Sequence, residues 1–150
     1  MQQDKARIRP PAPAPSPFPR VSAERCVCCH TPLTTQLGYA VPHVGTVGPK
    51  CVQEFTELGL ALERLEGLSV TEEDAAVANR LLSRLWHVGY NARVETNPDG
   101  TKRVVVTNFH KGAIKNVVQT WKERRAEFIR DLQLAELARE GRLAAHSVQA

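Results

Sequence analysis

The chain is poor in aromatic residues and contains no long apolar run. Phenylalanine, tryptophan and tyrosine make up only 5% of its 150 residues, although the apolar fraction of 42% suffices for a globular core. No stretch approaches the roughly 18 consecutive apolar residues of a membrane-spanning helix, so no membrane partner is expected. The N-terminal segment also lacks the apolar core of a secretory signal, because prolines interrupt it from Pro10 onward. The sequence therefore predicts a cytoplasmic protein.

Motifs that are typical of enzymes are also missing. The chain has no Gly-x-Ser-x-Gly element and no deaminase signature of His-x-Glu with Pro-Cys-x-x-Cys. The glycine-containing segment 45–50 lacks the spacing of a phosphate-binding loop, and no Ser or Thr follows its lysine. We therefore expect no enzymatic activity.

Cysteine is confined to one short window of the sequence. The four cysteines are Cys26, Cys28, Cys29 and Cys51. Cys26 and Cys29 form a C-x-x-C pair, a spacing that places two thiolates on one tight turn around a metal ion. Cys51 lies where a helix is expected to begin, and the free N–H groups and positive dipole of a helix start stabilise a thiolate. Because thiols stay reduced in the cytosol, the window predicts a structural Zn²⁺ site.

A tetrahedral zinc site needs a fourth ligand, and the sequence offers several. His43 is the first choice, since it falls on or just after an expected hairpin and can fold back toward Cys51. Cys28 and His30 are alternatives, although residues so close to the C-x-x-C pair usually point away from the ion. If they are not ligands, Cys28 is expected to be a small buried residue and His30 a surface residue. Glu54, one turn after Cys51, is a more distant option. The ligands that the sequence predicts are Cys26, Cys29, His43 and Cys51.

Residues 26–51 resemble small bacterial and phage zinc modules with the pattern C-x-x-C-G-x-x-L-T … G-x-G-P-x-C. The matching positions are Cys26, Cys29, Leu33, Thr34, Gly48, Pro49 and Cys51, within a segment of under a fifth of the chain. The chain departs from the pattern by carrying His30 in place of glycine and by the additional Cys28. The resemblance implies a treble-clef-like zinc module. Such modules often accompany nucleic-acid-handling proteins, so it also suggests a nucleic-acid partner.

The chain divides into an arm and two further segments. Residues 1–22 are expected to be a disordered Pro-rich arm, because their prolines alternate with small residues and favour extended conformations. Residues 23–67 form the expected zinc module, with a short hairpin followed by a helix. That helix should start near Pro49, which suits a first-turn position, and stop at Gly67.

Residues 69–150 are expected to form a helix, a β-hairpin and a long helix. The first helix begins with capping-box spacing at residues 71–74, and its apolar residues, Trp86 among them, should form its buried face. The turn sequence at 97–100 lies between two segments of β-branched and alternating residues, which predicts the hairpin. The long helix should run from about residue 111 to 139. The expected fold class is thus α+β.

Positive charge is concentrated in this last segment. Between Lys102 and Arg125 seven basic residues stand against Glu123 alone. A positive surface of this kind suits a polyanion, and phosphate contacts would supply most of the affinity. The sequence predicts non-enzymatic nucleic-acid binding, DNA being favoured over RNA, through Arg93, Lys102, Arg103, Lys111, Lys115, Lys122, Arg124 and Arg125.

The alternative hypothesis is a protein-interaction or assembly adaptor. Leu132, Leu134, Leu137 and Leu143 continue the long helix past the point where a small unit could cover them all. An exposed apolar helix favours a partner helix or a homodimer formed through the C-terminal helix. The feature that discriminates the two hypotheses is whether the basic residues after Gly100 share one face with the hairpin or scatter around it.

Overall fold

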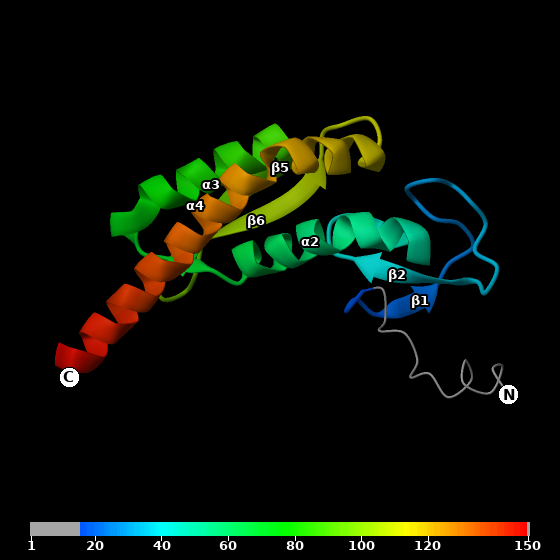
Figure 1. Cartoon of the computed structure of the whole chain (residues 1–150). Helices are drawn as coiled ribbons and strands as arrows, with labels where there is room; N and C mark the ends of the chain where they lie inside the picture. Colours follow the sequence, from blue (N-terminus) through cyan, green and yellow to red (C-terminus); the bar gives the residue numbers. More distant parts are fainter. Residues whose placement is uncertain (1–15, 150) are drawn as a thin grey trace, which may run out of the picture.

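The computed structural model describes residues 16–149, with side chains up to residue 141. Its elements are β1 (Arg20–Ser22), β2 (Leu37–Val41), β3 (Gly45–Val47), α2 (Pro49–Glu66), β4 (Ser69–Val70), the 3-10 helix η1 (Glu72–Asp74), α3 (Ala75–Val88), β5 (Tyr90–Thr96), β6 (Lys102–Phe109) and α4 (Ile114–Gln149). The described chain is therefore mixed α/β, with two small antiparallel sheets and three α-helices (Figure 1). None of the described helices combines the length and the apolar composition needed to cross a bilayer.

The first sheet has the strand order β1-β2-β3 and packs against α2. The central strand β2 pairs on both sides, with Tyr39 opposite Arg20 on β1 and opposite Val47 on β3. A Cβ atom added at Gly59 of α2 would lie 2.7 Å from the Phe18 ring and 2.8 Å from Val41. The missing side chain at Gly59 thus lets the sheet approach the helix closely.

The prediction of disorder for residues 1–22 is wrong for the residues of that segment that the structure describes. Residues 1–15 lie outside the described part of the chain, but Phe18 is buried and residues 20–22 form β1. The reason is that the Phe18 ring finds an apolar site against Gly59 of α2, and the next residues then pair with β2.

The second sheet has the strand order β4-β6-β5 and is covered by α3. Its hairpin closes through a hydrogen bond from the Asn97 N–H to the Thr101 carbonyl at 2.7 Å, and Gly100 has a positive φ of 87°. β4 pairs with β6 only at Lys102 and Arg103, so the rest of that edge of β6 has no strand neighbour among the described residues.

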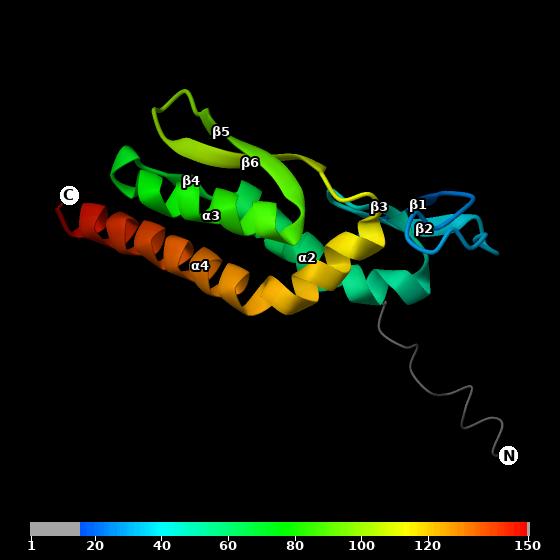
Figure 2. The ribbon, with the colours of Figure 1, turned by 90° about the horizontal axis from the view of Figure 1, so that it is seen from above.

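α2 connects the two sheets, which lie at its opposite ends in Figure 2. Its buried residues Leu58, Leu62 and Leu65 belong to one hydrophobic core that continues into both sheets, α3 and α4. α4 lies beside α3, where the Arg84 Nε is 2.7 Å from Asp131 Oδ2 (Figures 1 and 2). The segments 23–67 and 69–150 therefore share a core.

The prediction that Trp86 faces the core is wrong. Its side chain is 55% exposed, whereas Leu81, Leu85 and Val88 of the same helix are buried. Successive residues of an α-helix differ by about 100° around the axis, so Trp86 is rotated away from the stripe that contains Leu85. Trp121, in contrast, is 2% exposed and packs edge-to-face on Phe128.

Candidate metal centre

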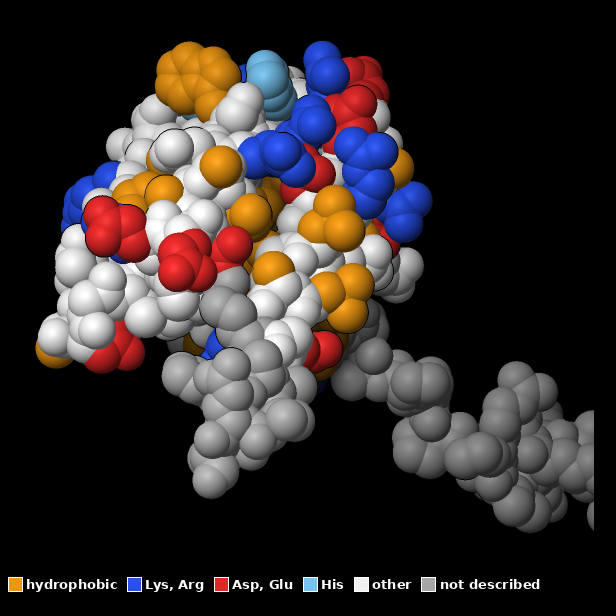
Figure 3. Space-filling model, turned by 90° about the vertical axis from the view of Figure 1, so that its left-hand side faces the viewer, with side chains coloured by type: hydrophobic (Ala, Val, Ile, Leu, Met, Phe, Trp, Pro, Cys, Tyr) orange, Lys and Arg blue, Asp and Glu red, His pale blue; other side chains and the backbone are white. Residues whose placement is uncertain are grey.

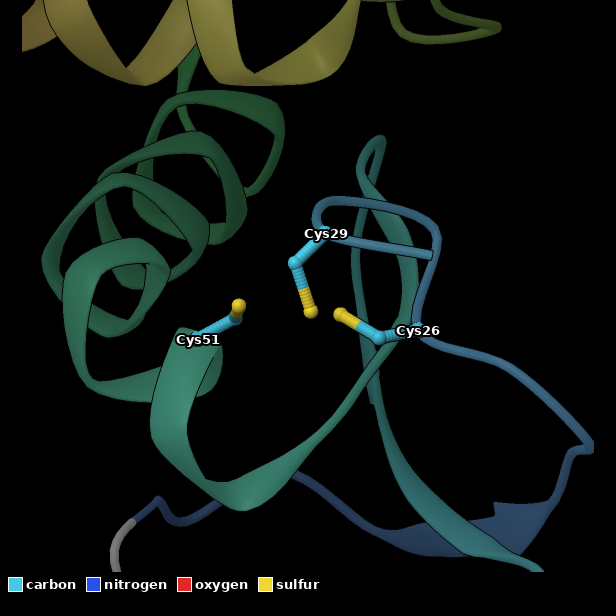
Figure 4. A group of neighbouring side chains, drawn as sticks. All are labelled: Cys26, Cys29 and Cys51. Atoms are coloured by element: carbon cyan, nitrogen blue, oxygen red, sulfur yellow. The ribbon is translucent and has the colours of Figure 1, made fainter. Parts of the chain in front are cut away.

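Three cysteine sulfurs from two separate segments converge beside the first sheet. The Sγ atoms of Cys26, Cys29 and Cys51 all lie within 4.8 Å of one another, and we call this group the sulfur triad. Figure 4 shows Cys26 and Cys29 projecting from the loop after β1 toward Cys51, which projects from the first turn of α2. Zn–S bonds of about 2.3 Å in a tetrahedron separate two sulfurs by about 3.8 Å, so small side-chain movements suffice to hold one ion.

The loop that carries Cys26 and Cys29 is shaped by backbone hydrogen bonds. The Cys26 N–H donates to the Thr31 carbonyl at 3.1 Å, and the His30 N–H donates to the Cys26 carbonyl at 2.9 Å. His30 has a left-handed φ of 61°, which costs a residue with a side chain about 1 kcal/mol. The zinc-module pattern has glycine at this position, where glycine would adopt the same conformation without strain.

The thiols of the triad differ in acidity. The Thr31 hydroxyl, whose Oγ1 lies 3.2 Å from Cys29 Sγ, and the Thr31 N–H lower the pKa of Cys29 to about 7. Burial raises the pKa of Cys51, and the neighbouring cysteines raise it further. Burial also raises the pKa of the nearby Cys28 thiol. A metal ion that binds Cys51 must therefore displace its proton.

His43, the predicted fourth ligand, does not belong to the sulfur triad. Its Nε2 lies 2.5 Å from Oε1 of Glu66 at the end of α2, and its carbonyl accepts a hydrogen bond from the Tyr90 hydroxyl at 3.0 Å. The second oxygen of Glu66 accepts the Val106 N–H at 3.1 Å. These contacts tie the β2–β3 turn to α2, β5 and β6.

Two cavities adjoin the sulfur triad. A groove of about 820 Å³ exposes Cys28, Cys29, Cys51 and Glu54 on one wall and the connection from β6 to α4, with Phe109, Ile114 and Lys115, on the other. We call it the thiol groove. A second cavity of about 480 Å³ lies on the other side of the triad, against Thr31 and the start of α2. The triad is thus reachable from solvent on two sides.

Most of the predicted nucleic-acid contacts are engaged in ion pairs. Arg93 and Arg103 both pair with Glu95, Lys122 pairs with Glu54, Arg125 with Glu57, and Arg124 lies 3.8 Å from Glu127. The Arg125 guanidinium binds both oxygens of Glu57 and holds the pKa of that carboxyl below its usual range. In Figure 3, Lys and Arg side chains gather at the upper right of the face shown, with Asp and Glu side chains beside them.

The remaining predicted contacts, Lys102, Lys111 and Lys115, make no ion pair within residues 16–141. Lys111 and Lys115 flank the start of α4, and the aliphatic part of Lys111 packs close to Gly89. The structure therefore does not gather all eight residues into one free basic patch.

Sequence reasoning missed an exposed aromatic pair next to these lysines. The rings of Trp86 and His110 lie 4.0 Å apart between centroids with an angle of 31°, and His110 Nε2 is 3.0 Å from the Trp86 carbonyl oxygen. The sequence did contain a signal for the exposure of Trp86. Trp86 directly follows Leu85, and adjacent residues of a helix cannot both lie at the centre of one apolar stripe.

The chemistry that this region offers is metal binding by soft ligands. Thiolates select Zn²⁺ over hard cations such as Mg²⁺ and Ca²⁺, and the three sulfurs fit the spacing of such a site. Neither protein-family models nor curated proteins nor solved structures show a match to this chain.

Proposed function

We propose that this protein holds one structural Zn²⁺ in a treble-clef-like module and binds nucleic acid without catalysing a reaction. The sulfur triad is the observation that carries the metal site, because two separate segments bring three sulfurs within 4.8 Å of one another. A C-x-x-C turn, the β2–β3 hairpin and the start of α2 supply the parts of a treble clef in the expected order. Thiolate-dominated sites are typically closed and structural.

The metal would stabilise a part of the protein that has little regular structure of its own. Between Ala23 and Gln36 the chain contains no strand apart from an isolated bridge of Arg25 with Pro32. Because the ion would join this loop to α2, its binding free energy contributes directly to the folding of the first module. This is a structural role, consistent with the absence of enzyme motifs from the sequence.

Lys111, Lys115 and the Trp86–His110 pair are the best candidates for nucleic-acid contact. Both lysines have ammonium groups free of carboxylate partners in the described residues, and an exposed indole can stack on a base of either DNA or RNA. The ion-paired arginines contribute less, although exposed pairs are worth only about 0–1 kcal/mol and can exchange a carboxylate for a phosphate. Two or three phosphate contacts predict a slope of about −2 to −3 for log K against log salt.

A fluorescence-anisotropy titration with labelled single- and double-stranded DNA and RNA tests this proposal. We expect binding at low salt whose affinity falls with salt concentration at the slope given above. The double variant Lys111→Gln, Lys115→Gln should bind with at least fivefold lower affinity (about 1 kcal/mol). The matched control is Lys122→Gln, Arg125→Gln, which removes the same charge from ion-paired positions and should cost less. No binding of any nucleic acid at low salt would refute the proposal.

The adaptor hypothesis keeps one specific observation in its favour. Leu134 and Leu137 of α4 are 50% and 61% exposed, and residues three apart lie on the same face of a helix. A molar mass of one chain by light scattering, unchanged by Leu134→Ser and Leu137→Ser, would exclude self-association through this face. A dimer that these substitutions dissociate would favour assembly as the function.

A further inference from the structure

We infer that Cys28, and not His43, is the fourth ligand of the metal site, so that four thiolates hold the ion. This inference rests on the proposed zinc site and names the residue that completes it. Cys28 lies in the turn between Cys26 and Cys29, and its thiol interacts electrostatically with the thiols of Cys26, Cys29 and Cys51. It also lines the thiol groove together with Cys29 and Cys51. Its sulfur is not among those that all lie within 4.8 Å of one another, so a rotation of the Cys28 side chain must bring it to the ion.

Two of the other candidates, His43 and Glu54, have side chains in contacts that ligation would break. The His43 ring is bound to Glu66, and its backbone is fixed by Tyr90. The Glu54 carboxylate is exposed and lies 3.0 Å from the Lys122 ammonium. The His30 side chain is exposed, and its carbonyl accepts a hydrogen bond from Arg25. Cys28, in contrast, is half-buried and lines the thiol groove together with two members of the triad.

The local backbone allows two neighbouring residues to reach the same ion. Residues 27–29 form a turn, so the chain curls around the triad at this point. Rotation about the Cα–Cβ bond moves each sulfur, and in a turn the side chains of consecutive residues need not point to opposite sides as they do in a strand. Cys28 and Cys29 can therefore occupy two corners of one tetrahedron.

The charge of a four-thiolate site is balanced by its surroundings. Four thiolates with Zn²⁺ carry a net charge of −2, whereas a site with one histidine carries −1. The N-terminus of α2, where Cys51 lies, presents the positive end of the helix dipole. Lys115 also lines the thiol groove and makes no ion pair within the described residues, whereas Glu54, which lines it too, is paired with Lys122. Both features favour the additional negative charge.

Cobalt titration of the reduced protein tests this inference, because Co²⁺ replaces Zn²⁺ in thiolate sites and absorbs visible light. We expect wild type to show tetrahedral d–d bands with strong thiolate-to-cobalt charge transfer. Cys28→Ser should lose about a quarter of the charge-transfer intensity, shift the d–d bands to shorter wavelength and weaken cobalt binding at least about tenfold. His43→Asn and Glu54→Gln are the matched controls and should leave the spectrum unchanged.

Each other outcome overturns a defined part of the interpretation. A Cys28→Ser spectrum identical to wild type refutes Cys28 as a ligand, and a spectrum altered in His43→Asn instead assigns the fourth position to His43. If wild type itself forms no tetrahedral cobalt complex, the proposed zinc site fails, and with it the inference. Circular dichroism of metal-free Cys28→Ser shows that any loss of binding is not a loss of fold, since Cys28 lies outside the buried core.

Discussion

Removing the Glu66 carboxylate should weaken the connection between the first sheet and the second. Glu66 accepts the N–H of Val106, on the edge of β6 that β4 leaves unpaired, and contacts the His43 ring with its other oxygen. Val106 is buried, so Glu66→Ala leaves a buried N–H without an acceptor, which costs about 1–3 kcal/mol, and the lost His43 contact adds about 1 kcal/mol. We therefore expect a loss of about 2–4 kcal/mol in the free energy of unfolding.

Urea denaturation of the zinc-loaded protein, followed by circular dichroism, measures this loss. Glu66→Gln is the matched control, because the amide oxygen can still accept the Val106 N–H and the amide group can still contact His43. Glu57→Ala removes an exposed ion pair with Arg125 and should cost only about 0–1 kcal/mol. If Glu66→Ala were no more destabilising than Glu57→Ala, Glu66 would not be the link between the two sheets. Zinc content should be unchanged in all three variants, since His43 is not a ligand in our interpretation.

Three further predictions concern the metal site and the α3–α4 contact. Chelation of zinc, or Cys26→Ser, should increase hydrogen exchange in the loop that follows β1 and leave protection in α3 and α4 intact, because the metal joins only that loop to α2. Zinc affinity should fall at least about a hundredfold per pH unit on acidification, because the pKa values of Cys51 and Cys28 are both raised and binding must displace both protons. Cys29, with a pKa of about 7, adds to the loss below that pH, and a competition assay with a zinc indicator measures the slope. Arg84→Leu should reduce the free energy of unfolding, measured in urea, by about 3 kcal/mol, because it removes the Arg84 guanidinium from the buried carboxylate of Asp131. Arg124→Leu, at an exposed pair, is the control and should change the free energy of unfolding by less than about 1 kcal/mol.

Elements marked by local signals could be predicted from the sequence. Pro49 and Gly67 bound α2 as expected, because proline is tolerated in the first turn of a helix and glycine favours its end. The turn at residues 97–100 joins the two long strands of the second sheet, as its composition predicts. Both signals depend on backbone preferences of a few neighbouring residues, which the sequence displays directly.

Features that depend on contacts between distant segments could not be predicted. The Phe18 ring packs against Gly59, some forty residues later in the chain, and no local pattern in the Pro-rich arm predicts that contact. The ion pair of Arg125 with Glu57 likewise joins α4 to α2, at the surface of the protein. Counting basic residues overestimated the free positive charge for this reason.

In the candidate site, too, local features could be predicted and long-range contacts could not. The grouping of Cys26, Cys29 and Cys51 was expected from their spacing and from the helix start, and the structure brings these three together. The direction of His43 depends on how the β2–β3 turn lies against Glu66 and Tyr90, which are distant in sequence. The zinc ion itself and the nucleic-acid partner remain predictions.

The contrasting positions of the two tryptophans give the protein a pair of natural optical probes. Trp86 is exposed beside His110, and Trp121 is enclosed against Phe128. An indole in water emits at longer wavelength than one in an apolar interior and is reached by iodide, so quenching separates the two signals without any label. The fluorescence of Trp86 then reports events at the surface, and the fluorescence of Trp121 reports whether the interior stays folded, in the same measurement.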